Sequence, residues 1–246
     1  MLPGKPIPHN RKPSAPVSRG WIAVDLDGTL AHYDPEHGVE IVGRPIEPIV
    51  YRIQRWLAMG IEVRIFTARA SRADLIPPLQ DWLGEIGLGQ LAITNRRDTD
   101  LLQIWDDRVV QLEMNTGTVL TPREYIMLDI SGWIGVELDG TLAHYHPKQP
   151  RHKLGEPVAK MRMRVQQWLK VDIDVRLFTG RAADPAMIPV IESWLEQHDM
   201  EKMKITCEKD FAMSQFWDDR GVHVVTNRGQ VAAQIDTMNP DRKYPV

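Results

Sequence analysis

The chain contains the same sequence twice, and this internal repeat is the feature that most limits how it can fold. Residues 21–33 (WIAVDLDGTLAHY) return as residues 133–145 (WIGVELDGTLAHY), 112 positions later. The same spacing holds without a gap for later pairs, such as Thr67 and Thr179. The repeat predicts two copies of one domain, spanning residues 21–132 and 133–246.

Within the segment 21–33 the two copies differ at one position that matters for chemistry. Asp25 of the first copy is replaced by Glu137 in the second, within an otherwise matching segment. If Asp25 acts as a nucleophile, the two halves are not equivalent.

The remaining composition sets the class of protein. Residues 1–20 hold five prolines, four Lys or Arg and no acid, which predicts a flexible basic tail without the apolar core of a signal peptide. The sequence contains no run of about 18 apolar residues that could span a membrane, so we expect no membrane partner. Cys207 is the single cysteine, which excludes an intramolecular disulfide and suits a reducing, cytoplasmic location.

Charge is distributed unevenly between the copies. Residues 21–132 carry 10 arginines, no lysine and 17 acids, for a formal charge of −7, whereas residues 133–246 are neutral with 16 of each sign. An acidic first half suits a site that gathers divalent cations, and it does not provide a broad basic footprint for nucleic acid.

Hydrophobic periodicity predicts alternating strands and helices in each copy. In the first copy we expect strands at 21–26, 61–66, 91–94 and 103–105, a further short strand at 109–112, and helices from Pro45 to about residue 57 and over 74–86. Alternation of this kind predicts an α/β fold with a parallel sheet and helices on both faces, that is, two tandem three-layer α/β/α (Rossmann-like) domains that pack together. Ligands of such sheets bind at the carboxyl ends of the strands.

Two carboxylates stand at the end of the first strand. Asp25 and Asp27 are two residues apart, so their side chains point to the same side, where one can attack as a nucleophile and the other can shuttle a proton. Gly28 permits a tight turn or a close backbone approach before Thr29. The alternative is an ordinary strand end at which Asp27 caps the next loop.

Partners for this pair follow the later strands. Thr67 offers a hydroxyl to a phosphoryl oxygen or simply caps the strand end, and Arg69 can hold a phosphate with two hydrogen bonds. Arg97 supplies a cation, unless it belongs with Arg96 to a solvated pair. Asp106 and Asp107 supply hard oxygen ligands that suit Mg²⁺; otherwise they form an acidic turn paired with Arg108.

Four segments have now been described: the first carries Asp25 and Asp27, the second Thr67 and Arg69, the third Arg97, and the fourth Asp106 and Asp107. In this order they resemble the haloacid-dehalogenase-like phosphohydrolase family, and the resemblance covers both repeats. It implies Asp25 as the nucleophile that forms an aspartyl-phosphate and Asp27 as the general acid and base. It also implies Thr67 and Arg97 as the groups that orient and neutralise the phosphoryl group, with Gly28, Thr29 and Arg69 close to the substrate. The implied Mg²⁺ ligands are Asp25, Asp27 through its carbonyl oxygen, Asp106 and the adjacent Asp107.

The second repeat retains most of this set. Its equivalents are Glu137, Asp139, Thr179, Arg181, Lys209, Asp218 and Asp219. The family usually has lysine where the first repeat has Arg97, and the two cations are not interchangeable. One added methylene at Glu137 moves the attacking oxygen by about 1 Å, so we expect the second repeat to bind Mg²⁺ but to turn over poorly.

The Thr-x-Arg and Trp-Asp-Asp-Arg segments resemble in particular the 3′-phosphatase half of phage polynucleotide kinases, although no GxxxxGK[ST] loop is present. The resemblance implies a Mg²⁺-dependent phosphatase for a nucleotide or a nucleic-acid 3′-phosphate. The alternative is a non-hydrolytic module that binds or sequesters a phosphorylated ligand. The short loop after Asp27 leaves no room for a large cap domain, so we expect the site to be open or to be roofed by the other repeat or by another subunit.

Overall fold

The computed structural model describes residues 20–127 and 130–232, and within them the two repeats fold through the same order of elements. The first repeat contains β1 (Trp21–Val24), α1 (Glu47–Ala58), β2 (Glu62–Phe66), η1 (Ala68–Ser71), η2 (Ala73–Leu75), α2 (Ile76–Glu85), β3 (Ala92–Thr94), β4 (Leu101–Asp106), β5 (Val109–Gln111) and η3 (Arg123–Tyr125). The second contains β6 (Trp133–Val136), α3 (Ala159–Lys170), β7 (Val175–Phe178), η4 (Gly180–Ala183), η5 (Pro185–Met187), α4 (Ile188–Gln197), β8 (Lys204–Thr206), β9 (Met213–Asp218) and β10 (Gly221–His223).

Local sequence explains these elements. All four residues of β1 are buried, as the continuous apolar run predicts. Helix α1 has a proline in its first turn, and it buries Ile49, Val50, Ile53 and Trp56, which recur at three- and four-residue steps. The parallel α/β class predicted from the sequence is confirmed. None of the helices in the described ranges is long and apolar enough to cross a membrane.

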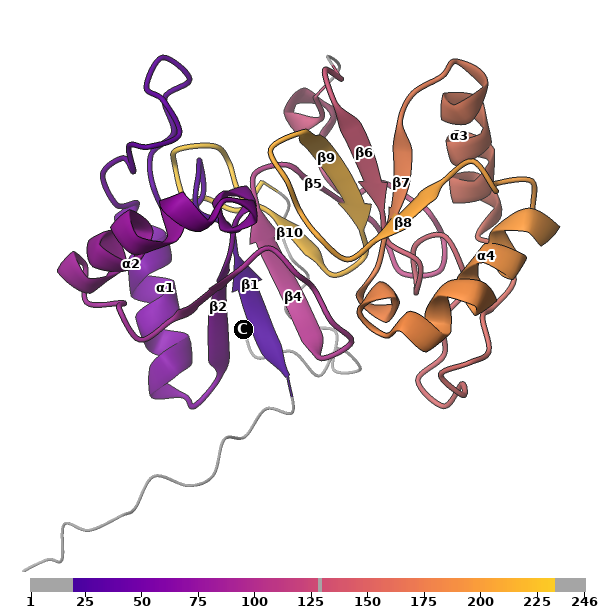
Figure 1. The fold of residues 1–246 in the computed structure, drawn as a ribbon, viewed down its shortest axis with the longest axis horizontal. Helices are drawn as coiled ribbons and strands as arrows, with labels where there is room; N and C mark the ends of the chain where they lie inside the picture. Colours follow the sequence, from indigo (N-terminus) through magenta and orange to yellow (C-terminus); the bar gives the residue numbers. More distant parts are fainter. Residues whose placement is uncertain (1–19, 128–129, 233–246) are drawn as a thin grey trace, which may run out of the picture.

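The two repeats exchange their last strands. The structure has two five-stranded parallel sheets, one in the order β10-β4-β1-β2-β3 and the other in the order β5-β9-β6-β7-β8. Each sheet therefore takes four strands from one repeat and an edge strand from the other, so that yellow β10 lies beside magenta β4 in Figure 1. The boundary near residue 132 consequently does not divide the chain into two self-contained sheets.

A short connection explains the exchange. Only Asp107 and Arg108 separate β4 from β5. Parallel neighbours in one sheet need a crossover of about a dozen residues or more, so β5 cannot return to pair beside β4 in the same direction. It continues instead into the second sheet, where Val109 pairs with Phe216. The equivalent short link after β9 sends β10 to β4.

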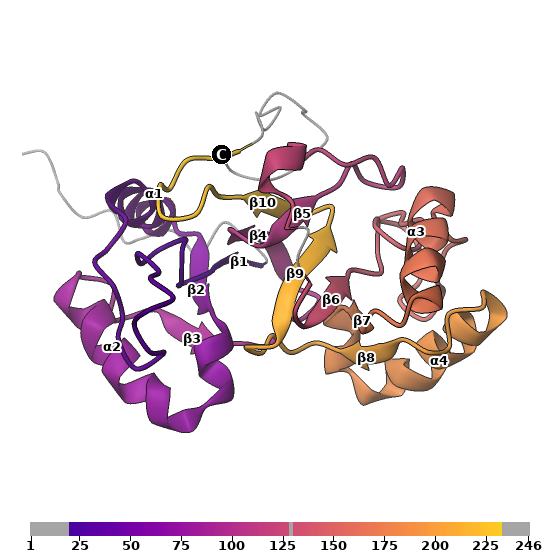
Figure 2. The same ribbon diagram turned by 90° about the horizontal axis from the view of Figure 1, so that it is seen from above.

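The layers differ from the sequence-based expectation of helices on both faces of each sheet. Helices α1 and α2 share one apolar core with Ile22 and Val24 of β1, which places both helices on one face. Trp21 and Ala23, on the opposite face, belong to a separate apolar cluster with Trp133 and Phe216 of the second repeat. The sheets therefore pack against each other with the helices outside, as seen from above in Figure 2. The links at 95–100 and 107–108 are too short to hold helices that would cover the inner faces.

Candidate active site

The first site gathers at the carboxyl ends of three neighbouring strands. Asp25 follows β1, Thr67 follows β2, and Asp106 ends β4. Because β1 lies between the other two in a parallel sheet, these ends meet at one edge. Asp25 and Thr67 are 4% and 1% exposed, so the groups predicted from the sequence to act together do converge in a buried position.

An acidic group at this edge has the chemistry of a Mg²⁺ site. Ligand oxygens of Asp25, Asp106 and Asp107 all lie within 4.8 Å of one another. Asp107 Oδ1 is buried and has no hydrogen-bond partner among the described residues. Three hard carboxylates with an unsatisfied oxygen fit a divalent cation that prefers oxygen ligands.

Burial and mutual repulsion change the proton affinity of these acids. Burial, followed by the charge of Asp106, raises the pKa of Asp25 well above its usual range. The same two causes raise the pKa of Asp107 to about 6. A divalent cation would offset both the lost hydration and the repulsion.

The cation in the first site comes from the other repeat. Lys209 Nζ lies 2.8 Å from Asp25 Oδ1 and 2.5 Å from Asp106 Oδ2. Burial by itself lowers the pKa of Lys209, but Asp106 and Asp25 outweigh it and raise that pKa above its usual value. The expectation that Arg97 serves the first site is wrong, because Arg97 lies in the second site. The sequence-based assignment assumed that each repeat completes its own site. In the structure, the cation of each site comes from the other repeat.

Arg69 also differs from its predicted role. Its guanidinium donates two hydrogen bonds to the Asp27 carboxylate, of 2.9 and 2.7 Å, and a further one to the Ile41 carbonyl oxygen at 2.9 Å. It also contacts the Val39 carbonyl oxygen. Arg69 is only 3% exposed, so in this state it orients Asp27 and the loop above it instead of facing a phosphate.

The residues around Asp27 are closely fitted. Gly28 has φ +84°, and a Cβ built there would lie 2.3 Å from Asp107 Oδ2, so only glycine is accommodated without displacement. Thr29 is fully buried, and its hydroxyl lacks a hydrogen-bond partner among the described residues. Thr67 Oγ1 accepts the Arg69 N–H at 3.2 Å, which leaves the hydroxyl proton available for donation.

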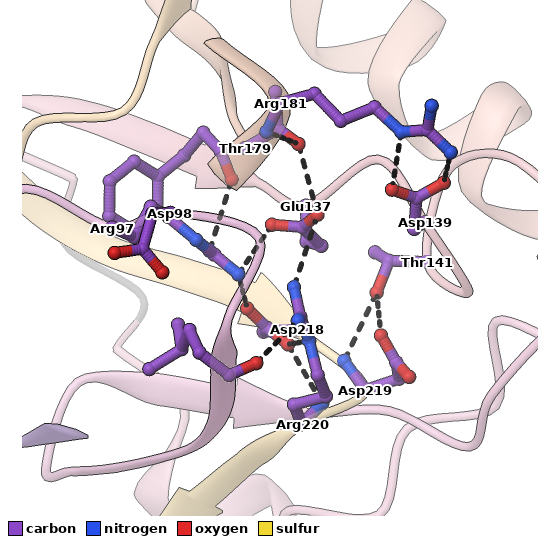
Figure 3. A network of polar contacts seen from close by, with 12 residues as sticks. Arg97, Asp98, Glu137, Asp139, Thr141, Thr179, Arg181, Asp218, Asp219 and Arg220 are labelled. Atoms are coloured by element: carbon purple, nitrogen blue, oxygen red, sulfur yellow. Dashed lines mark hydrogen bonds and ion pairs between the residues drawn. The ribbon is translucent and has the colours of Figure 1, made fainter. Parts of the chain in front are cut away.

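The second site contains the equivalent residues, but the Glu137 carboxylate lies between the cations and the hydroxyl of this site (Figure 3). Glu137 lies 2.5 Å from the Arg97 guanidinium and 3.3 Å from that of Arg220. Its other close contact is a 3.1 Å hydrogen bond donated by the Thr179 hydroxyl. The longer side chain therefore engages both the Thr179 hydroxyl and the Arg97 guanidinium of this site.

Both departures from the pattern of the family that the sequence resembles thus meet in one site. The first site combines Asp25 with Lys209, and the second combines Glu137 with Arg97. Burial and, to a smaller extent, Asp218 raise the pKa of Asp219 to about 7. Among the described residues the second site has no acidic group as compact as the one around Asp25, which does not support the expectation that it binds Mg²⁺.

The remaining equivalents in the second repeat keep some of the contacts of the first. Arg181 holds Asp139 through two hydrogen bonds of 2.6 and 2.8 Å, as Arg69 holds Asp27. Asp219 accepts a hydrogen bond from the Thr141 hydroxyl at 3.1 Å. The two sites therefore share this arginine–aspartate pair, but they differ in the acid after the first strand, in the cation and in the threonine hydroxyl, which is bonded at Thr141 and has no partner among the described residues at Thr29.

Each site is roofed in part by the other repeat, one of the arrangements expected from the short loop after Asp27. The side chain of Asn227 accepts from the Tyr33 N–H at 2.7 Å and donates to the Tyr33 carbonyl oxygen at 2.9 Å. Its neighbour Thr226 donates to Asp107 at 2.9 Å. A pocket of about 410 Å³ lies beside Asp27 and Arg69, under this roof. These two roof residues could not be identified from the sequence, because they follow the exchanged strand β10.

A larger pocket of about 480 Å³ lies over the second site. Its walls include Thr99 and Met114 of the first repeat beside Tyr145 of the second. Met114 occupies the position that Thr226 has over the first site, so the apolar side chain offers no hydroxyl to Asp219.

None of the protein-family models matches this chain, and the curated proteins and solved structures compared with it gave no match either.

We expect Mg²⁺ to stabilise the protein through the first site alone. A ligand that binds only the folded state at about 100 times its Kd adds about 2.7 kcal/mol to the free energy of unfolding. Asp106→Asn should remove most of the Mg²⁺-dependent rise in melting temperature, whereas Asp218→Asn, at the equivalent position of the second site, should retain it. Equal responses in the two variants would contradict the assignment.

Asp219 should make stability depend on pH. Its folded pKa of about 7 exceeds the usual 3.8, so the folded state binds more protons between these values. The free energy of unfolding therefore falls as pH rises from about 4 to 7, by up to about 1.4 kcal/mol per pH unit for one group. Urea unfolding in EDTA should show a shallower slope for Asp219→Asn. Asp172→Asn, in an exposed turn, should keep the wild-type slope; an unchanged slope in Asp219→Asn would refute the assignment.

Proposed function

We propose that the first site hydrolyses a phosphomonoester through an aspartyl-phosphate on Asp25. The observation that carries the proposal is the convergence of Asp25, Asp27, Thr67 and the Lys209 ammonium beside an acidic group suited to Mg²⁺. This set combines a nucleophile, a proton shuttle and positive charge for the phosphoryl oxygens.

The proposed reaction has two steps. An Asp25 oxygen attacks phosphorus, the bond from phosphorus to the leaving oxygen breaks, and Asp27 gives that oxygen its proton. Water then attacks the phosphorus, Asp27 takes a proton from the water, and the bond to Asp25 breaks to release phosphate. Thr67 donates its hydroxyl proton to a phosphoryl oxygen, and Lys209 balances the charge. Mg²⁺, held by Asp25, Asp106, Asp107 and the Asp27 carbonyl oxygen, would supply electrostatic stabilisation of the phosphoryl oxygens.

The preferred substrate class is a nucleotide or a nucleic-acid 3′-phosphate, and it rests on the resemblance to the phosphatase half of phage polynucleotide kinases. The family assignment, haloacid-dehalogenase-like, is part of the same proposal. The pocket beside Asp27 lies where a leaving group would receive its proton, and it includes Tyr33 and Arg44 among its walls.

A second candidate is a non-hydrolytic module that binds a phosphorylated ligand. One observation favours it: both oxygens of Asp27 are engaged by Arg69, so proton transfer requires this pair to loosen. Multiple turnovers would exclude the binding module, whereas release limited to one phosphate per chain, or none, would exclude the phosphatase.

The test is Mg²⁺-dependent phosphate release from a panel of mononucleotides and 3′-phosphorylated oligonucleotides. Preference for oligonucleotides combined with activity that falls steeply with salt would identify a polynucleotide substrate, because contacts to the phosphate backbone are salt-dependent. Preference for mononucleotides with little salt dependence would identify a small substrate.

A further inference from the structure

The two loops that carry the buried cations cross and hold each other. The backbone N–H of Lys209 donates to the Asn95 carbonyl oxygen at 2.8 Å, and the backbone N–H of Arg97 donates to the Cys207 carbonyl oxygen at 2.9 Å. The Asn95 side chain adds a 2.9 Å bond to the Lys209 carbonyl oxygen. The loops 95–97 and 207–209 therefore form one short antiparallel unit between the sites.

Each loop of this unit carries a buried cation, and the two cations lie in different sites. Lys209 ends in the first site, between Asp25 and Asp106. Arg97, which is 0% exposed, ends in the second site, where it contacts Glu137 at 2.5 Å and Asp218 at 2.9 Å. The backbone hydrogen bonds between the loops thus join the two cations through a short stretch of backbone.

We propose that the filled second site is a positioning device for the first, in which Glu137 anchors Arg97 and thereby fixes the Lys209 ammonium against Asp25 and Asp106. Glu137 and Arg97 are positioning residues that act through the crossed loops. The kinetic consequence rests on the proposed phosphatase function, whereas the position of Lys209 does not.

The chemistry of Glu137 suits an anchor. Its carboxylate is 1% exposed and is engaged by Arg97, Arg220 and Thr179, so the second site needs no ligand to hold Arg97. The Arg97 guanidinium also donates to the Phe178 carbonyl oxygen at 3.1 Å and lies over the Phe178 ring. Neutralising Glu137 leaves a buried guanidinium short of one anion, which favours its displacement.

The direct test observes the Lys209 ammonium by nuclear magnetic resonance in protein labelled with ¹⁵N-lysine, without metal. A buried, paired ammonium exchanges its protons slowly, and loss of the signal in Lys209→Met assigns it. Glu137→Gln should shift this signal and speed its proton exchange at least about tenfold, because the anchor loosens. Asp139→Asn, which removes a charge from the same site but not from Arg97, should leave the signal unchanged.

A milder pair of variants tests the crossing itself, in case Glu137→Gln folds poorly by circular dichroism. Asn95→Ala removes the side-chain bond to the Lys209 carbonyl oxygen, and it should shift the Lys209 signal. Cys207→Ala, at the equivalent position of the other loop, should shift it much less. An unchanged Lys209 signal in folded Glu137→Gln, or in folded Asn95→Ala, would overturn the proposal.

The kinetic arm separates this proposal from the proposed function. Glu137→Gln should lower kcat for phosphate release about tenfold to a hundredfold, in keeping with the cost of misplacing a catalytic group by about 1 Å. Asp139→Asn should not lower it. If wild type shows no turnover while the Lys209 signal still responds to Glu137→Gln, the phosphatase assignment fails and the positioning role stands. Unchanged kcat in folded Glu137→Gln would refute the positioning role.

Discussion

Asp25→Asn is expected to reduce Mg²⁺-dependent phosphate release by at least about a thousandfold, because an amide cannot form the covalent intermediate. Asp25 is the acid at the end of β1, and it faces both Lys209 and the acidic group. The measurement is steady-state phosphate release on the best substrate of the panel, with a burst experiment to detect phosphorylated protein.

The chain offers a matched control for this substitution. Asp139→Asn also replaces a carboxylate by an amide close to a strand end, but in the second site, where Asp139 is half-buried and Arg181 holds it. It should retain most of the wild-type rate. Full activity in Asp25→Asn would show that Asp25 is not the nucleophile.

Lys209→Met is expected to lower kcat about a hundredfold to a thousandfold, the usual cost of removing one group that stabilises transition-state charge. This result would be informative because Lys209 belongs to the other repeat, which has Glu137 at the position of Asp25, the proposed nucleophile. Removing the ammonium also leaves Asp25 and Asp106 facing each other without compensation, so the metal-free protein should unfold more easily and Mg²⁺ should bind more tightly.

Phosphate release, urea unfolding in EDTA and Mg²⁺ titration calorimetry would measure the three effects. Lys204→Met makes the same chemical change on an exposed lysine of β8 and should leave all three unchanged. An active Lys209→Met variant, or one with unaltered Mg²⁺ affinity, would contradict the position of Lys209 in the first site.

The crossed cations change how the two departures from the family pattern are understood. Considered within each repeat, Arg97 weakens the first half and Glu137 weakens the second. In the folded chain both lie in the second site, at 2.5 Å from each other, and the first site keeps the aspartate and the lysine together. One site therefore retains the full set of groups, and the other site carries both changes.

Strand positions, the parallel class and the group of Asp25, Thr67 and Asp106 could be predicted from the sequence, because periodicity and strand-end motifs are local signals. The carboxyl ends of adjacent parallel strands must meet, so residues within one repeat could be brought together without a structure. The two-residue link at Asp107 and Arg108 was also visible in the sequence, and it forbids a parallel return beside β4.

The sequence by itself determined that the chain holds two copies of one α/β unit and which residues end each strand. Only the tertiary structure decided which copy completes which site. That choice depends on the exchanged strands β5 and β10 and on the crossed loops, where Lys209 and Arg97 each reach the opposite repeat. The physical reason is that pairing between distant segments is set by packing of the two inner sheet faces, through residues such as Trp21 and Trp133, and no local pattern encodes it.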